Sequence, residues 1–163
     1  MPLVTLRPAD LADLAAPSPA LLAGIAEGFA GDDPGGHTAV AEALSDMTTD
    51  AGPAPFNAYW AARGGVIVGL CSFKRGLDAQ RAVEIAYFTF ADFEGQGVAR
   101  GMVAALTVIA RRAGAAAVTA RTLPEKNASG SVLTRSGFSW LGEIEDPEDG
   151  RVWAWRREIA PAP

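Results

Sequence analysis

The chain has 163 residues, of which 49% are hydrophobic, and a formal net charge of −5. This length allows one hydrophobic core of full size, so we expect residues 1–163 to form a single domain. The acidic balance argues against a nucleic-acid partner, because affinity for a phosphate backbone depends on clustered cations. The single cysteine, Cys71, excludes a disulfide framework, and its apolar neighbours predict a small buried side chain.

The sequence predicts neither secretion nor insertion into a membrane. Residues 1–10 lack the charged region followed by an apolar one that marks a signal peptide. The longest apolar helical segment, residues 102–110, ends at Arg111 and is too short to span a bilayer. Together with the single cysteine, these features favour a cytoplasmic protein. One histidine, His37, and one cysteine provide too few ligands for a zinc site, so no metal is expected.

The N-terminal third predicts one short strand followed by helices. Residues 3–7 alternate in polarity and end at Pro8, which indicates a first strand. Residues 9–52 are helical in composition but interrupted by prolines and glycines. We therefore expect two or three short helices there, one near residues 20–29 and one near residues 38–47, with His37 in the loop before the second.

The remainder of the chain predicts a run of strands and then an alternation of strands and helices. The expected elements are strands at residues 56–62, 66–73 and 83–90, a helix from Val98 to about residue 113, a strand at 115–120, a helix at 128–135, and strands at 138–145 and 152–157. Gly64 and Gly65 between the first two strands indicate a hairpin, while Gly114 and Gly137 end the two helices. This order predicts a fold of the α/β (α+β) class.

The segment FEGQGVARGMVAAL, residues 93–106, places Gly95, Gly97 and Ala99 between a strand and a helix. Helix N-termini carry unpaired N–H groups and a partial positive charge, so a bare backbone there suits a phosphate group. An ordinary strand-to-helix turn explains the same spacing equally well. The P-loop pattern fails because no Lys-Ser or Lys-Thr follows, and a dinucleotide fingerprint is disfavoured because Arg100 holds the third glycine position.

Three segments in the same order resemble the GNAT acetyltransferases. EGQGVA, residues 94–99, resembles the Q/R-x-x-G-x-G/A loop of the family, and VEIAYFTFADF, residues 83–93, resembles its fourth strand. TLPEKNASGSVLTRSGF, residues 122–138, resembles the branch that contains the ribosomal-protein N-terminal acetyltransferases. The resemblance covers residues 56–157. It implies a central mixed, mostly antiparallel sheet of about six to seven strands, flanked by helices, whose strands at residues 87–90 and 117–121 splay apart.

The resemblance implies acetyl-CoA as co-substrate, bound without a metal. The residues that it places around the coenzyme are Phe88, Thr89, Phe90, Glu94, Gly95, Gln96, Gly97, Val98, Ala99, Arg100, Asn127 and Ser129. The main chain of residues 88–90 would pair with the pantetheine amides, and the amides of residues 96–100 would hold the pyrophosphate. Lys126 competes with Asn127 for the contact with the pantetheine arm.

Acetyl transfer to an amine needs a neutral amine, a polarised thioester and a proton for the departing thiolate. In the resemblance a carboxylate at the position of Glu84 often serves as the base, and Glu84 is the leading candidate, with an ordinary solvated carboxylate as the alternative. Glu125 is the second candidate. The proton donor stays unassigned because Leu133 stands where many relatives carry a tyrosine. Ser131 or Ser129 could serve, although Ser129 is equally a candidate helix cap.

These features predict an N-acetyltransferase that moves an acetyl group from acetyl-CoA to a primary amine by direct attack. The acceptor would be a protein N-terminus or a small-molecule amine. A non-catalytic acyl-CoA-binding or regulatory module is the alternative, because Leu133 and Glu94 depart from the family pattern. A homodimer that uses the terminal strands is compatible with the sequence.

Overall fold

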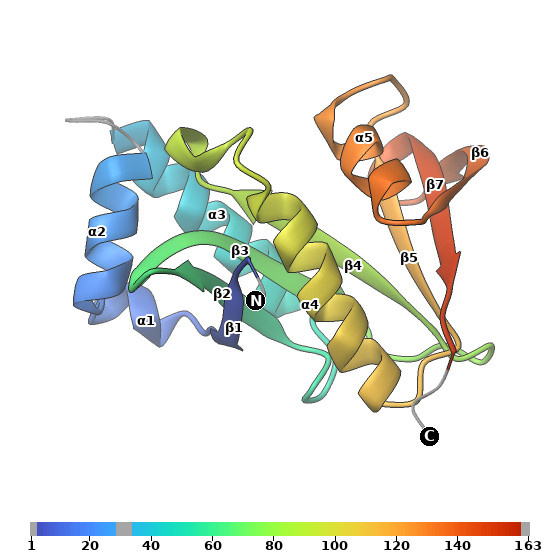
Figure 1. Ribbon diagram of the computed structural model, residues 1–163, viewed down its shortest axis with the longest axis horizontal. Helices are drawn as coiled ribbons and strands as arrows, with labels where there is room; N and C mark the ends of the chain where they lie inside the picture. Colours follow the sequence, from blue (N-terminus) through green and yellow to red (C-terminus); the bar gives the residue numbers. More distant parts are fainter. Residues whose placement is uncertain (1–2, 29–33, 161–163) are drawn as a thin grey trace.

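The computed structural model describes residues 3–28 and 34–160, and Figure 1 shows the arrangement of its helices and strands. Seven strands form one sheet in the order β1-β2-β3-β4-β5-β7-β6. The strands are β1 (Thr5–Pro8), β2 (Ala58–Arg63), β3 (Val66–Lys74), β4 (Ala82–Thr89), β5 (Ala117–Thr122), β6 (Ser139–Asp146) and β7 (Gly150–Glu158). The helices are α1 (Ala12–Ala15), α2 (Pro19–Gly28), α3 (Pro34–Asp50), the short 3₁₀ turn η1 (Ala91–Phe93), α4 (Val98–Arg112) and α5 (Ala128–Arg135).

The sheet is mixed and mostly antiparallel, as the sequence predicted. Among the strands of the described residues, only β4 and β5 run parallel, and each of the other neighbouring pairs is antiparallel. Gly64 and Gly65 connect β2 to β3 with φ angles of 58° and 78°, the left-handed conformation that a two-residue hairpin turn needs. The predicted hairpin is therefore confirmed, together with the class of the fold.

Helices cover both faces of the sheet. Met102 of α4 lies against Gly69 on one face, and its thioether would be 3.1 Å from a Cβ at that glycine. Met47 of α3 lines a hollow on the opposite face beside Ser72 and Phe88. In Figure 1, α4 and α5 lie in front of the sheet and α3 lies behind it. Burying both faces explains why β3 is apolar along almost its whole length.

The helices of the N-terminal region differ from the prediction. The third helix, α3, has 17 residues and begins at Pro34, because proline suits the first turn of a helix. His37 therefore lies in the first turn of α3 and not in a loop before it. Within the described residues, no helix is both long and apolar enough to cross a membrane, and no group of side chains is suited to hold a metal ion.

Cys71 lies in the hydrophobic core on β3, as predicted. Burial raises the pKa of its thiol far above the ordinary range, which keeps it in the neutral form. The Cys71 side chain therefore acts as a packing group and not as a nucleophile.

The parallel pair β4 and β5 separates half-way along. Their register runs from Ala82 opposite Ala117 to Ile85 opposite Ala120 and ends there. In Figure 1 the two strands touch near the bottom of the view and diverge toward the top. The expected splay is present, but residues 117–120 are paired, not parted as predicted. The gap begins after Ile85 on β4 and after Ala120 on β5.

Candidate functional site

The part of β4 that lies beyond the last pairing with β5 presents free main-chain groups to the gap. The Phe90 N–H donates to the Val68 carbonyl on β3 at 3.0 Å, which makes these two residues a hydrogen-bonded antiparallel pair. Bonded pairs alternate along an antiparallel ladder, so Phe88 also directs its main-chain groups to β3. Tyr87 and Thr89 consequently direct theirs to the other side, where β5 no longer pairs with them. Tyr87 and Thr89 are half-buried, and a ligand in the gap can act as partner to these main-chain groups.

This alternation decides which of the predicted strand residues direct their main chain to the gap. The N–H groups of Phe88 and Phe90 are directed to β3, and that of Phe90 is already used by Val68. Of the three strand residues that the sequence placed around the coenzyme, only Thr89 faces the gap with its main chain. Tyr87, which was not predicted from the sequence, faces the gap as well.

The first turn of α4 is a bare helix N-terminus beside this gap. Gly97 caps the helix in a left-handed conformation with φ of 81°, and Gly95 has φ of 73°. No side chain caps this end, and no acidic residue lies in the first turn. Glu94, Gly95 and Gln96 are exposed, while Val98 is buried and begins the helix. Free N–H groups and the partial positive charge of the helix therefore face solvent, as an anion site requires.

The loop before α4 is held in place by side chains. The Arg63 guanidinium donates to Gln96 Oε1 at 2.6 Å, and Gln96 Nε2 donates to the Asp92 carbonyl at 3.1 Å. The Arg63 guanidinium also lies 5.6 Å from the centre of the Phe93 ring, within reach of a cation–π interaction. The end of β2 thus holds the Gln96 side chain and the loop before α4 in place. Arg63 was not selected from the sequence, because nothing in its neighbourhood connects it to residue 96.

A cavity of about 600 Å³ extends over α4 from this N-terminus toward α5 and β7. Gly97, Arg100 and Gly101 line one end, and Arg135 and Arg157 line the other. Among its lining residues the only charged groups are these three guanidinium groups, so the cavity favours an anion. Arg100 therefore lies beside Gly97 in a cavity lined by cations.

The Tyr87 side chain reaches from β4 to α5. Its hydroxyl donates to the Ser129 carbonyl on α5 at 3.3 Å. Burial raises the pKa of the Tyr87 phenol, which keeps it protonated at neutral pH. The phenol therefore keeps its proton, and its hydroxyl lies between β4 and α5. The sequence did not indicate this contact, because an aromatic residue in a strand is most often a packing residue.

A second cavity, of about 580 Å³, opens on the other face of β4, beside α3. Asp46 and Asp50 of α3 line it together with Glu148 and Asp149 of the β6–β7 connection. Lys74 is the one cation among its lining residues. Asp46 and Asp50 are one helical turn apart, so their charges repel each other unless a cation lies near them. The sequence offered a signal for this cavity in the acidic run DPEDG, but nothing that joined this run to α3.

Glu84 lies deeper on β4 in a network of charges. Its Oε2 is 3.5 Å from the Lys74 ammonium, and its Oε1 is 3.9 Å from Arg75 and 3.6 Å from Arg121. Arg121 also pairs with Asp146 of β6. Both oxygens of the Glu84 carboxylate are therefore engaged by cations where β4 and β5 are still paired. Through its ion pairs with Lys74 and Arg121, the Glu84 carboxylate on β4 connects this strand to β3 and β5. It is not among the acidic residues that line the cavity beside α3.

The segment after β5 is spread over different surfaces. Asn127 caps α5, accepting from the Gly130 N–H at 2.9 Å, so the cap is Asn127 and not Ser129. Ser129 faces Tyr87 with its carbonyl group. Ser131 is exposed and lines a pocket against β6 and β7, away from Tyr87. Glu125 is exposed on the connection from β5 to α5 and lines none of these cavities.

The sequence profile of the acetyltransferase (GNAT) domain family matches residues 3–139. The chain belongs to the GNAT acetyltransferase family. The match includes the β4 edge, the loop before α4 and all of α5, so the family predicted from the three sequence segments is confirmed. No curated protein matches the chain in sequence.

Solved GNAT structures share the fold at low sequence identity. The acetyltransferase from Salmonella typhimurium that modifies the N-terminal serine of a 50S ribosomal subunit protein is 19% identical, with a TM-score of 0.68, and the match covers 98% of this chain and 97% of that one. RimJ from Mycobacterium smegmatis, solved with a CoA disulfide, is 21% identical, with a TM-score of 0.67 and coverage of 96% and 82%. The microcin self-immunity acetyltransferase MccE, solved with acetyl-CoA and AMP, is 18% identical, with a TM-score of 0.60 and coverage of 75% and 71%.

In this GNAT chain, Leu133 of α5 is fully buried in the core. Leucine has no proton to give, so the side chain at this position cannot protonate a thiolate. Tyr87 is the residue whose hydroxyl lies between β4 and α5. The chain therefore places a phenol from β4 against α5, whereas position 133 of that helix holds leucine.

Proposed function

We propose that this protein transfers the acetyl group of acetyl-CoA to the primary amine of an acceptor that carries further positive charge. The observation that carries the proposal is the free edge of β4 beyond Ile85, which lies beside the bare N-terminus of α4. A ligand with an extended chain of amide groups can form hydrogen bonds with such a strand edge, while phosphate groups of the same ligand bind the helix N-terminus. Coenzyme A has both parts, and family membership supports its acetyl form.

The coenzyme would lie in the gap and over α4. The pyrophosphate accepts hydrogen bonds from the main-chain N–H groups of residues 97–100, with Arg100 beside it. The pantetheine amides pair with the main chain of Thr89 and Tyr87, and the thioester reaches the point where β4 leaves β5. Residues 94–96 complete the turn, and the fixed Gln96 side chain keeps it in shape before the coenzyme arrives.

The chemistry follows from the groups around the gap. The neutral amine nitrogen attacks the thioester carbonyl carbon, and a main-chain N–H of β4 stabilises the oxygen anion that forms. The carbon–sulfur bond then breaks, and the thiolate takes a proton from the Tyr87 hydroxyl. The proton that the amine loses passes through water to the carboxylates of the cavity beside α3. Glu84 holds β4 against β5 through its cations and sets the point at which they part.

The acceptor enters from the cavity beside α3. Its four carboxylates, from Asp46, Asp50, Glu148 and Asp149, attract a cationic molecule and repel an anionic one. A protein N-terminus followed by basic residues and a small diamine both satisfy this requirement. The branch resemblance and the fold shared with an enzyme that acetylates a ribosomal protein support the protein N-terminus. We therefore propose a basic N-terminal segment as the preferred acceptor.

The test is an acceptor screen with the purified protein. Free thiol released from acetyl-CoA is measured with peptides that share one N-terminal residue but carry zero, one or two lysines at positions two to four. We expect the rate to rise with each added lysine and mass spectrometry to locate the acetyl group on the α-amine. Acetyl-CoA binding by calorimetry, without turnover on any peptide or diamine, would instead identify a non-catalytic acyl-CoA-binding module.

A further inference from the structure

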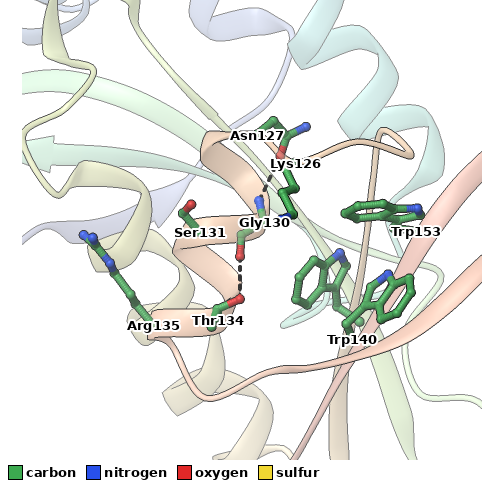
Figure 2. Close-up of a pocket in the computed structure, with 9 residues that line it drawn as sticks. Lys126, Asn127, Gly130, Ser131, Thr134, Arg135, Trp140 and Trp153 are labelled. Carbon is green, nitrogen blue, oxygen red and sulfur yellow. Dashed lines mark hydrogen bonds between the residues drawn. The ribbon is translucent and has the colours of Figure 1, made fainter.

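Three tryptophan side chains form a pocket between α5 and the strands β6 and β7, as Figure 2 shows. Its volume is about 530 Å³, within the range of pockets that hold small molecules. Trp140 comes from β6, and Trp153 and Trp155 come from β7. The α5 helix separates this pocket from the gap, because Ser129 meets Tyr87 on the other side of the helix. The pocket therefore plays no part in the acetyl transfer proposed above.

The indole groups are held in fixed positions. Trp155 Nε1 donates to the Thr122 hydroxyl at 3.0 Å, and its ring is buried. A Cβ at Gly130 would lie 3.3 Å from this ring, so glycine lets the indole pack directly on the α5 backbone. Trp140 and Trp153 meet edge to face, with centroids 5.3 Å apart and planes at 62°. The buried Trp155 ring thus forms the base of the pocket, and the Trp140 and Trp153 rings form its sides.

The polar groups of the helix add little to this surface. Asn127 Oδ1 accepts from the Gly130 N–H, and the Thr134 hydroxyl donates to the Gly130 carbonyl, each at 2.9 Å. The three indoles are the large apolar groups among the lining residues, and Trp140 is 54% exposed. Exposing an indole to water is unfavourable, and a cluster of such rings at the surface marks a binding site.

The charge of the pocket is positive. Lys126 and Arg135 are its only charged lining residues, and neither takes part in an ion pair among the described residues. In Figure 2, Arg135 points away from the indoles, while Lys126 lies with Asn127 at one end of the pocket. A ligand among the indoles would therefore meet the ammonium group of Lys126.

We propose that this pocket binds a planar aromatic anion, with its ring among the three indoles and its anionic group at Lys126. Indole walls favour a flat ring over an aliphatic chain, because stacked and edge-to-face contacts add to the burial of apolar area. A quaternary ammonium ion, the usual guest of an aromatic cage, is opposed here by Lys126 and by the absence of a carboxylate among the lining residues. The volume admits a ring system of two fused rings with one carboxylate.

The test uses three probes of one shape on the full chain. Naphthalene-1-carboxylate, naphthalene-1-methanol and 1-naphthylmethylammonium differ mainly in charge. Calorimetry and the quenching of tryptophan fluorescence give their affinities. We expect the carboxylate to bind best, with the alcohol about tenfold weaker and the ammonium compound weaker still. Tightest binding of the ammonium compound would overturn the proposal.

Single substitutions locate the binding site of the probe. Trp140→Ala is expected to weaken the carboxylate about tenfold, and Lys126→Gln about fivefold while leaving the alcohol unchanged. Leu141→Ala is the control, since Leu141 is a neighbour on β6 that is 59% exposed and does not line the pocket. Equal affinity in Trp140→Ala and the wild type, with both proteins folded by circular dichroism, would refute the site.

Two further measurements distinguish a separate aromatic site from an extension of the coenzyme site and from a dimer interface. Saturating acetyl-CoA is expected to change the affinity for naphthalene-1-carboxylate less than twofold, because α5 lies between the two sites. Displacement by acetyl-CoA would make the pocket part of the coenzyme site and overturn the proposal. A dimer in sedimentation experiments, with Trp140 shielded from acrylamide, would assign the indoles to a second copy of the chain and also overturn it.

Discussion

The N-terminus of α4 and the cavity beside α3 present opposite kinds of groups. The α4 end offers main-chain N–H groups and guanidinium groups, held by glycines and by the Arg63–Gln96 bond. The cavity offers carboxylates from α3 and from the β6–β7 connection, segments about 100 residues apart. One site is built from continuous backbone and the other from side chains that the fold brings together. The backbone site suits an anion whose shape is always the same. The side-chain site can be altered by substitutions to fit a different acceptor.

The largest effect is expected from Gly97→Asp, at the backbone site. A side chain at φ of 81° is strained, its Cβ would be 3.0 Å from Leu3, and its carboxylate would face the phosphates. We expect acetyl-CoA affinity measured by calorimetry to fall by about 100-fold or more. Gly65→Asp is the control, because Gly65 has φ of 78° and open space around it. Equal loss of acetyl-CoA affinity in Gly97→Asp and Gly65→Asp would show that backbone strain, and not the carboxylate beside the phosphates, lowers the affinity.

The backbone site could be predicted from the sequence because its parts are contiguous. Gly95, Gly97 and the helix that follows them appear in one segment, and positive φ angles restrict those two positions to glycine. The seven strands followed in the same way from local polarity and from turn residues such as Gly64. The end of the β4–β5 pairing depends on long-range register, so it was misplaced by a few residues.

The side-chain site could not be predicted, since its members meet only in three dimensions. Asp46 on α3 and Asp149 after β6 have no local signal that joins them. Tyr87 was overlooked because its proposed role depends on where β4 leaves β5 and on the contact with Ser129 of α5. Glu84 was selected from its strand position, but the ion pairs with Lys74 and Arg121 depend on neighbouring strands.

The second largest effect is expected from Tyr87→Phe, between the two sites. Loss of the hydroxyl removes the proposed proton donor, while the ring still fills its place. We expect kcat to fall about tenfold to 100-fold with little change in acetyl-CoA affinity, because a thiolate leaves without an acid more readily than an alkoxide. Tyr59→Phe is the control, since its hydroxyl donates to the Pro55 carbonyl in the core. An unchanged kcat in Tyr87→Phe would remove the residue from the mechanism.

A smaller effect is expected from the cavity itself. The double variant Asp46→Asn with Asp50→Asn lowers the negative charge that an acceptor meets. We expect kcat/KM for a dilysine peptide to fall about threefold to tenfold, with little change for a peptide without lysine. Glu42→Gln on the same helix is the control, because Glu42 is exposed and does not line the cavity. Equal losses on both peptides would show that these aspartates do not recognise charge.

The smallest effect on turnover is expected from Glu84→Gln, which tests whether this carboxylate belongs to the chemistry or to the scaffold. Its two oxygens are engaged by three cations, so the substitution leaves Lys74 and Arg121 with weaker partners in a half-buried place. We expect the free energy of unfolding in urea to fall by about 1–2 kcal/mol, while kcat stays within about threefold of the wild type.

Glu143→Gln is the control for Glu84→Gln, since it weakens an exposed pair with Arg151 and should change stability by less than about 0.5 kcal/mol. A general base at this position would give the opposite result. The Glu84→Gln variant would then unfold like the wild type but lose turnover about 100-fold or more, most strongly at low pH. That outcome would move a catalytic carboxylate from the cavity beside α3 to the paired part of β4 and β5. The protein would then have a third functional site, around Glu84, beside the backbone site at α4 and the side-chain site at α3.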